Sequence, residues 1–168
     1  MIGNDVIDLV KSRNDSNWRR QGFVSKLFNT HERILIENSQ NPEIEVWLLW
    51  SMKEAAYKIW NRQTGIRMYM PKRLRCSVIE SSPCYAVGEV ACEGNRYYTE
   101  TVICSDFIHT VAVEELIYLE HILEITRDEI FKDSFGIPGI SIKDQNVVLP
   151  VSVSNHGRFE RIVTIKKL

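Results

Sequence analysis

The sequence predicts an α+β fold in which an antiparallel sheet packs against helices. Apolar residues recur at helical spacing between residues 43 and 61, and short β-branched and aromatic runs alternate with turn signals between residues 74 and 113. The chain of 168 residues is long enough for one core but not for two comfortable domains. We therefore expect a single domain that spans residues 1–168.

Composition and charge are those of an ordinary globular protein. Apolar residues make up 44% of the chain and charged residues 26%, and the formal net charge is -1. A nucleic-acid binder is a weak alternative, because the chain has neither a global positive field nor a known reading motif. The four cysteines lack C-x-x-C spacing, and no basic leader or membrane-length apolar run is present. We expect a cytoplasmic protein with reduced thiols that binds neither nucleic acid nor membranes.

The first part of the chain predicts a strand followed by two helices. The opening "MIGNDVIDL" is typical of a strand, and "NTHERILIEN" predicts a helix start with Asn29 or Thr30 as the cap and Glu32 as a capping-box acid. The apolar residues between 43 and 61 form the core face of the second helix, which Gly65 is expected to end. Four polar residues are expected off that face: Lys53, Glu54, Lys58 and Asn61.

The second part of the chain predicts mostly strands. Residues 74–113 have the pattern of an antiparallel meander, with "SSP", "EGN" and "SD" as turns. The segment 114–132 has apolar residues along one side and predicts a third long helix. The final segment predicts two strands around the polar break "SNHG".

Each polar candidate, taken alone, has an ordinary structural explanation. Glu54 and Lys58 have the spacing of a surface pair that contributes a few tenths of a kcal/mol, Asp5 and Asp8 suit a loop, and Glu32 suits a helix cap. Taken together, the acids on the strand and on the helix indicate a metal-binding site. An acid at the end of a strand and an acid on a helix with a buried face are a common way to hold Mg²⁺, while a ligand's phosphates complete the coordination shell.

Two segments carry a resemblance to a known family. "IGNDVIDL" and "WSMKEAAYK" resemble the first and second motifs of the 4′-phosphopantetheinyl transferases, which move phosphopantetheine from coenzyme A to a serine of a carrier protein. The resemblance implies that Asp5 and Glu54 are metal ligands and that Asp8, the accompanying acid, belongs to the same metal site. It also implies that Lys58 contacts phosphate.

Two further segments extend the resemblance. "FNTHE" is similar to the segment that carries the proposed base in two-lobed members, which gives that role to Glu32. "PVSVSNHGRF" resembles the S-x-S-H segment that holds the 3′-phosphate and adenosine of coenzyme A. Here an Asn intervenes, so Ser154, Asn155 and His156 are all candidates for the ligand position. Judged from its neighbours in the sequence alone, His156 is explained as a residue of a turn.

The resemblance implies Mg²⁺-dependent transfer of 4′-phosphopantetheine from coenzyme A to an acyl or peptidyl carrier protein, with release of 3′,5′-ADP. Fatty-acid and secondary-metabolite carriers both remain open, and the alternative is a catalytically degenerate binding protein of the same fold. The motif order is that of single-unit members, which build each site between two copies, so a homo-oligomer is expected, with the acids of one copy facing the final segment of another. The acidic carrier is expected on Arg13, Arg19 and Arg20, or otherwise on the cluster from Lys72 to Arg75.

Overall fold

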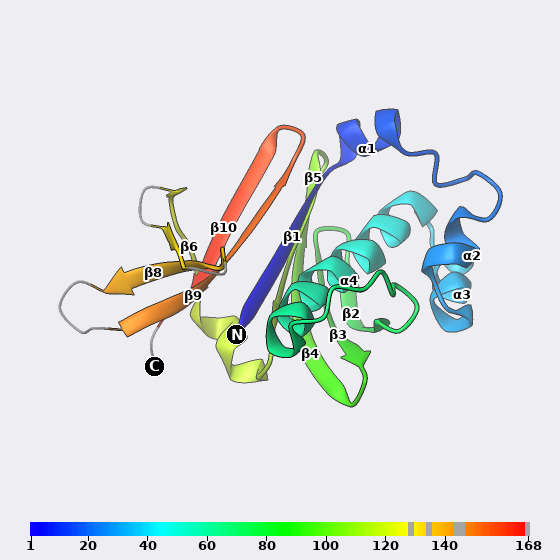
Figure 1. The fold of residues 1–168 in the computed structure, drawn as a ribbon. Helices are drawn as coiled ribbons and strands as arrows, with labels where there is room; N and C mark the ends of the chain where they lie inside the picture. The colour runs from blue at the N-terminus through cyan, green and yellow to red at the C-terminus, as the bar shows by residue number, and fades with distance from the viewer. Residues whose placement is uncertain (128–129, 134–135, 143–146, 167–168) are drawn as a thin grey trace.

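Two antiparallel sheets lie side by side in the computed structural model, and helices cover one face of the first sheet (Figure 1). The structure describes residues 1–127, 130–133, 136–142 and 147–166. The first sheet has the strand order β1-β5-β4-β3-β2. Its strands are β1 (Ile2–Asp8), β2 (Arg75–Ser82), β3 (Tyr85–Cys92), β4 (Asn95–Ile103) and β5 (Phe107–Val113). The predicted α+β class and the meander are confirmed, and the four cysteines are free thiols.

The second sheet comes from the last third of the chain and has the order β6-β10-β9-β8-β7. Its strands are β6 (Ile122–Glu124), β7 (Phe131–Lys132), β8 (Pro138–Ile142), β9 (Val147–His156) and β10 (Phe159–Ile165). β9 and β10 form a hairpin, as predicted for the final segment. The break between them is shorter than "SNHG", because Asn155 and His156 belong to β9 and only Gly157 and Arg158 form the turn.

Four helices precede the meander: α1 (Leu9–Asp15), α2 (Phe23–Leu27), α3 (Thr30–Asn38) and α4 (Pro42–Thr64). The predicted capping box starts α3, since the Asn29 side chain accepts from the Glu32 N–H at 3.0 Å and Glu32 accepts from the Asn29 N–H at 2.9 Å. Helix α4 ends at Gly65, which has φ 70°. In the described part of the chain, no helix is both long enough and apolar enough to cross a membrane.

The predicted helix over residues 114–132 is wrong. The chain there forms a short 3-10 helix, η1 (Leu116–His121), followed by β6 and later β7; residues 128–129 of that prediction lie outside the described residues. Ile122 pairs with Ile165 of β10, and Leu119 packs against the small apolar cluster between the sheets. Pairing with a strand about forty residues downstream therefore overrode a helical apolar pattern.

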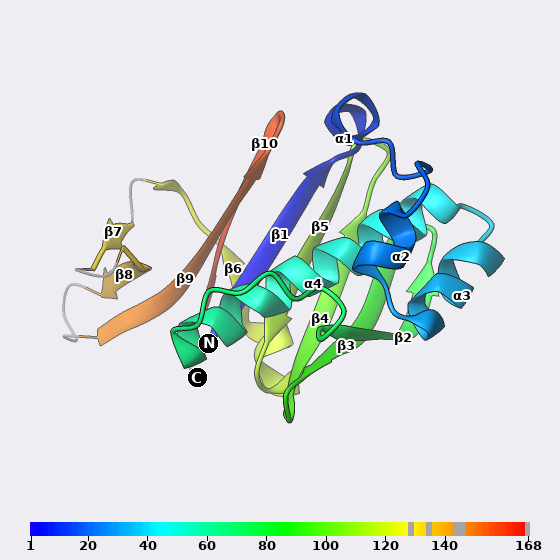
Figure 2. The same cartoon turned by 45° about the vertical axis from the view of Figure 1, so that its right-hand side comes forward.

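Helix α4 lies across the first sheet and against β1 (Figure 2). Its residues Leu49, Met52, Ala55, Ala56 and Ile59 are almost completely buried. A Cβ at Gly3 would lie 2.0 Å from the carbonyl oxygen of Ala55, so only glycine permits this approach of β1 to α4. The contact brings the residues that follow Gly3 and those that flank Ala55 to one place.

Candidate active site

Asp5 of β1, Glu54 and Lys58 of α4 and Ser154 of β9 meet where the two sheets adjoin. The Ser154 hydroxyl donates to Asp5 Oδ1 at 3.1 Å, and Lys58 Nζ donates to the carbonyl oxygens of Asn4 at 2.5 Å and of Val153 at 3.1 Å. The charges of Asp5, Glu54 and Lys58 influence one another. The structure thus brings together four of the predicted site residues.

Burial controls the electrostatics of this group. Burial raises the pKa of Asp5, and the charge of Lys58 and the Ser154 hydroxyl oppose that rise. Burial and the charge of Asp5 raise the pKa of Glu54 to about 7, while Lys58 opposes. The pKa of Lys58 itself is lowered, because burial outweighs the two carboxylates. The carboxylates of Asp5 and Glu54 are here called the carboxylate pair. An additional cation bound beside them would therefore be stabilised by their charge.

Asp8 is not brought to the carboxylate pair. Its Oδ1 accepts from the N–H groups of Val10 and Lys11, and Arg158 binds both carboxylate oxygens through its side chain. These bonds, led by the Arg158 side chain, hold the pKa of Asp8 well below its usual range. A Cβ at Gly157 would lie 2.4 Å from Asp8 Oδ2, so glycine is needed for this approach. Among the described residues, no group of three or more His, Cys, Asp or Glu is placed to hold a metal ion.

The predicted coenzyme A segment contacts the free edge of β1. Three backbone N–H groups of β1, those of Asn4, Val6 and Asp8, point away from β5. They donate to Ser152 Oγ at 2.9 Å, Ser154 Oγ at 3.1 Å and His156 Nδ1 at 3.0 Å, respectively. An edge strand needs such partners, and side chains of alternate β9 residues supply them. The side chain of Asn155, which lies between Ser154 and His156 in β9, makes no such bond to β1 and is exposed to solvent.

Two basic side chains of α4 complete the contact between β1 and β9. Lys58 bridges carbonyl oxygens of both strands, and Arg62, one turn further along the helix, does the same with Ile2 at 3.1 Å and Val151 at 3.0 Å. Sequence reasoning missed Arg62, although its i+4 spacing from Lys58 was a usable signal. Ser152 was also missed, although it starts the period-two pattern of the final segment.

Glu32 lies away from the carboxylate pair, in the interior beside Lys53. Both residues have 0% exposure, and Lys53 Nζ donates to both Glu32 oxygens at 2.8 Å. Lys53 also donates to the carbonyl oxygens of Pro71 and Leu74, and Glu32 accepts from the N–H of Cys76. The expectation that Lys53 lies off the core face is wrong, because a buried carboxylate and two carbonyls satisfy its charge.

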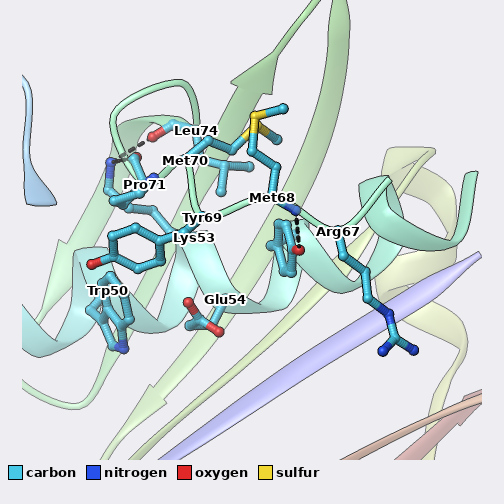
Figure 3. A pocket seen from close by; sticks show the side chains of 10 residues that line it. Trp50, Lys53, Glu54, Arg67, Met68, Tyr69, Met70, Pro71 and Leu74 are labelled. Carbon is cyan, nitrogen blue, oxygen red and sulfur yellow. Dashed lines mark hydrogen bonds between the residues drawn. The ribbon is translucent and has the colours of Figure 1, made fainter. Parts of the chain in front are cut away.

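Glu54 faces a cavity of about 380 Å³, here called the apolar cavity (Figure 3). Trp50, Tyr69 and Met70 line it, Glu54 lies beside Trp50, and Lys53 turns toward Pro71 and Leu74. The Tyr57 hydroxyl accepts from the N–H of Met68 at 3.2 Å and fixes the loop over this cavity. Glu54 makes no hydrogen bond to another described residue, so its carboxylate is available to a ligand.

Comparison with known proteins places these residues in a family. No curated protein matches the chain. A family model of the 4′-phosphopantetheinyl transferase superfamily matches residues 1–106 of the 168. The match contains the carboxylate pair, Lys58 and Glu32, and it ends before β5 and the whole second sheet. Because the match covers more than half of the chain, this protein belongs to the 4′-phosphopantetheinyl transferase superfamily.

Proposed function

We propose that this protein transfers 4′-phosphopantetheine from coenzyme A to a serine hydroxyl of an acyl or peptidyl carrier protein. The observation that carries the proposal is the meeting of Asp5, Glu54 and Lys58, which come from two separate motifs of the family. In the reaction, the serine oxygen bonds to the phosphorus attached to pantetheine. The bond from that phosphorus to the bridging oxygen breaks, and 3′,5′-ADP leaves. Retention of all three residues argues against a degenerate binding protein.

Asp5 and Glu54 suit Mg²⁺ as a cofactor. They offer hard carboxylate oxygens, and Mg²⁺ is often held by one or two carboxylates plus the phosphates of a substrate. Burial and then the charge of Asp5 raise the pKa of Glu54, and a bound cation would stabilise the ionised carboxylate against both. When bound, Mg²⁺ would neutralise charge on the pyrophosphate. Asp8 has no part in this proposal, because its oxygens are held by Arg158 and the first turn of α1.

The remaining steps use groups of the chain itself. Lys58 is close enough to the carboxylate pair to bind a pyrophosphate oxygen with its charge. The serine proton would pass to water in the apolar cavity, which Glu54 borders, because the carboxylates assigned to Mg²⁺ are not free to accept it. Glu32 has both oxygens bound in the interior. Ser154 orients Asp5 through its hydroxyl.

A transfer assay with coenzyme A, Mg²⁺ and a panel of apo carrier proteins tests the proposal. We expect Asp5→Asn and Glu54→Gln to lower kcat by roughly a hundredfold or more, the scale on which lost electrostatic stabilisation acts. Glu54→Gln should fold at least as stably as the parent above pH 7, because burial raises the pKa of Glu54 and so makes its ionised form unfavourable there. Lys58→Ala should cost less activity than either.

Glu45→Gln is the matched control. Glu45 lies on the same helix and burial raises its pKa as well, but its carboxylate bonds to Ser39 and not to the site. We expect this variant to transfer normally. Normal turnover in both Asp5→Asn and Glu54→Gln, or coenzyme A affinity that is unchanged by EDTA, would refute the assignment. Binding of coenzyme A without transfer to any carrier would favour the degenerate binding protein.

The carrier protein is proposed to dock on the basic surface around α2. Arg13, one of the predicted residues, forms an ion pair with Glu43 at 2.8 Å, so its charge is partly balanced within the chain. Arg20 and Lys26 line a cavity of about 540 Å³ together with Trp50 and Tyr69. Since Trp50 and Tyr69 also line the apolar cavity beside Glu54, an acidic partner held at α2 would present its serine close to the carboxylate pair.

A further inference from the structure

The backbone of Asn4, the residue before Asp5 in β1, is bonded to two other elements. Its N–H donates to Ser152 Oγ of β9 at 2.9 Å, and its carbonyl oxygen accepts from Lys58 Nζ of α4 at 2.5 Å. The residue that precedes Asp5 therefore also holds the ammonium group of Lys58. A shift of Asn4 would move both of these site residues.

The side chain of Asn4 is buried and meets residues of both sheets. It lies on the face of β1 opposite Asp5, because side chains alternate along a strand. Its Nδ2 donates to the carbonyl oxygen of Arg161 in β10 at 3.1 Å and lies 3.3 Å from Nε2 of His109 in β5. Asn4 Oδ1 is buried and has no hydrogen-bond partner in the described part of the chain. The Arg161 carbonyl therefore decides how the amide is oriented, because exchanging its nitrogen and oxygen would set two oxygen atoms against each other.

The orientation of this amide fixes the protonation of His109. Because Asn4 presents an N–H group, His109 Nε2 must accept, and Nδ1 must carry the ring proton. Burial first and the charge of Arg161 second lower the pKa of His109 to about 4. Lys58 acts in the same direction, and Glu124, which pairs with Arg161 at 2.7 Å, opposes it. His109 is thus neutral at neutral pH, and a proton on Nε2 would break its contact with Asn4.

We propose that Asn4 and His109 are positioning residues: the neutral imidazole accepts from the Asn4 amide and thereby fixes Asp5 and Lys58 in the site. This inference rests on the proposed function for what Asp5 and Lys58 do in the reaction. His109 lies beyond residue 106, where the family match ends, so the first motif is supported by a strand outside that match. Groups that are fixed before the substrate binds need no rearrangement when charge develops.

Nitrogen-15 NMR of the imidazole rings tests the contact without turnover. We expect His109 to carry its proton on Nδ1 and to stay neutral down to about pH 5, since its pKa is about 4. His31, which is exposed on α3, is the comparison ring in the same spectrum. A proton on Nε2 of His109 at neutral pH, or a pKa of His109 at the usual value of about 6.5, would overturn the proposal.

His109→Gln and His109→Leu form a matched pair of variants. Gln places an acceptor oxygen near the position of Nε2 and does not titrate, whereas Leu offers no acceptor. Relative to His109→Gln, the parent should lose stability as the pH falls from about 6.5 to about 4, because the folded state binds a proton on His109 more weakly than the unfolded state does. Urea midpoints at several pH values measure this difference. A difference that does not change with pH would contradict a neutral, buried His109.

The transfer assay measures the effect on the site. We expect His109→Leu to lower kcat per folded molecule by about tenfold, and His109→Gln to keep it within about twofold of the parent, because only Gln holds the Asn4 amide in place. Asn4→Ala/His109→Leu should lose no more than Asn4→Ala alone, since both changes remove the same hydrogen bond. His31→Gln is the control for the loss of an imidazole and should transfer normally. Equal kcat in His109→Leu and His109→Gln, or losses that multiply in the double variant, would overturn the proposal.

Calorimetry with coenzyme A and Mg²⁺ keeps the proposed reaction and the positioning apart. If the parent transfers nothing, but its affinity for coenzyme A falls by about threefold or more in His109→Leu and recovers in His109→Gln, the reaction is refuted and the positioning is supported. Transfer by the parent with unchanged kcat in His109→Leu would support the reaction and overturn the positioning.

Discussion

Glu32 illustrates how one residue can fit a catalytic motif and still be held by the fold. Its two oxygens accept from Lys53, from the Asn29 N–H and from the Cys76 N–H. These bonds tie α3, α4 and the start of β2 together. The sequence predicted the cap of Glu32 correctly, but it could not predict the burial of Lys53, because a lysine counts as polar in any periodicity argument. The position of Glu32 is decided by its contacts with Lys53 and Cys76, which lie 21 and 44 residues away along the chain.

We expect Glu32→Gln and Lys53→Met each to lower the free energy of unfolding by about 3–5 kcal/mol, since removing one partner leaves an uncompensated buried charge or donor. The double variant should cost less than the sum of the two single changes. Urea unfolding followed by circular dichroism measures all three. Activity per folded molecule should stay within about an order of magnitude of the parent in Glu32→Gln, whereas loss of a general base would cost about a hundredfold or more. Full stability with abolished kcat would restore Glu32 as the base.

At the scale of elements, the sequence predicted those helices and strands whose formation depends on residues close to one another in the chain. β1, α3, α4 and the meander have their caps, turns and apolar patterns within a few residues, and all are where the sequence predicts them. The segment 116–124 fails because its partner is β10, far along the chain. The contact between β1 and β9 spans 148 residues, so its alternating Ser152, Ser154 and His156 resembled a ligand motif and not an edge support.

The surface around α2 yields a prediction for the carrier protein. Arg20→Glu/Lys26→Glu should raise KM for the carrier by about tenfold at low ionic strength and leave KM for coenzyme A unchanged, because surface steering acts on the charged partner and is screened by salt. Steady-state kinetics at two salt concentrations measures both constants. Arg75→Glu is the control for the alternative cluster at Lys72 to Arg75. The opposite result, a raised carrier KM in the control alone, would move the docking surface to that cluster.

At the scale of the whole molecule, β1 joins the parts of the site. It pairs with β5 on one side, contacts β9 on the other and packs against α4 through Gly3. Asp5, Glu54 and Lys58 could be predicted because each lies in a short motif. The cavity that Arg62, Arg127 and Lys132 line could not be predicted, since Arg127 and Lys132 belong to no motif and lie near Arg62 only after the second sheet has formed.

The expected homo-oligomer, with the acids of one copy facing the final segment of another, stays a prediction, although the final segment already reaches the acids within one chain. Ser154 contacts Asp5 of its own chain, and Ser152 and His156 hold the same β1. The second sheet of this chain thus occupies the side of β1 that a neighbouring copy was expected to cover. A shared site is then no longer needed to explain how one unit surrounds coenzyme A.

We therefore expect one chain to be a complete catalytic unit, whatever its state of assembly. Specific activity should stay constant over about a hundredfold dilution, since a site shared between copies would lose activity as the assembly dissociates. Sedimentation at the same concentrations records the assembly. Co-expressed Glu54→Gln and Ser154→Ala chains should show no more activity than the two variants measured separately, because neither chain can complete the other's site. Activity that falls on dilution together with dissociation, or that co-expression restores, would mean that β9 exchanges between copies and that the contact of Ser154 with Asp5 is also made across an interface.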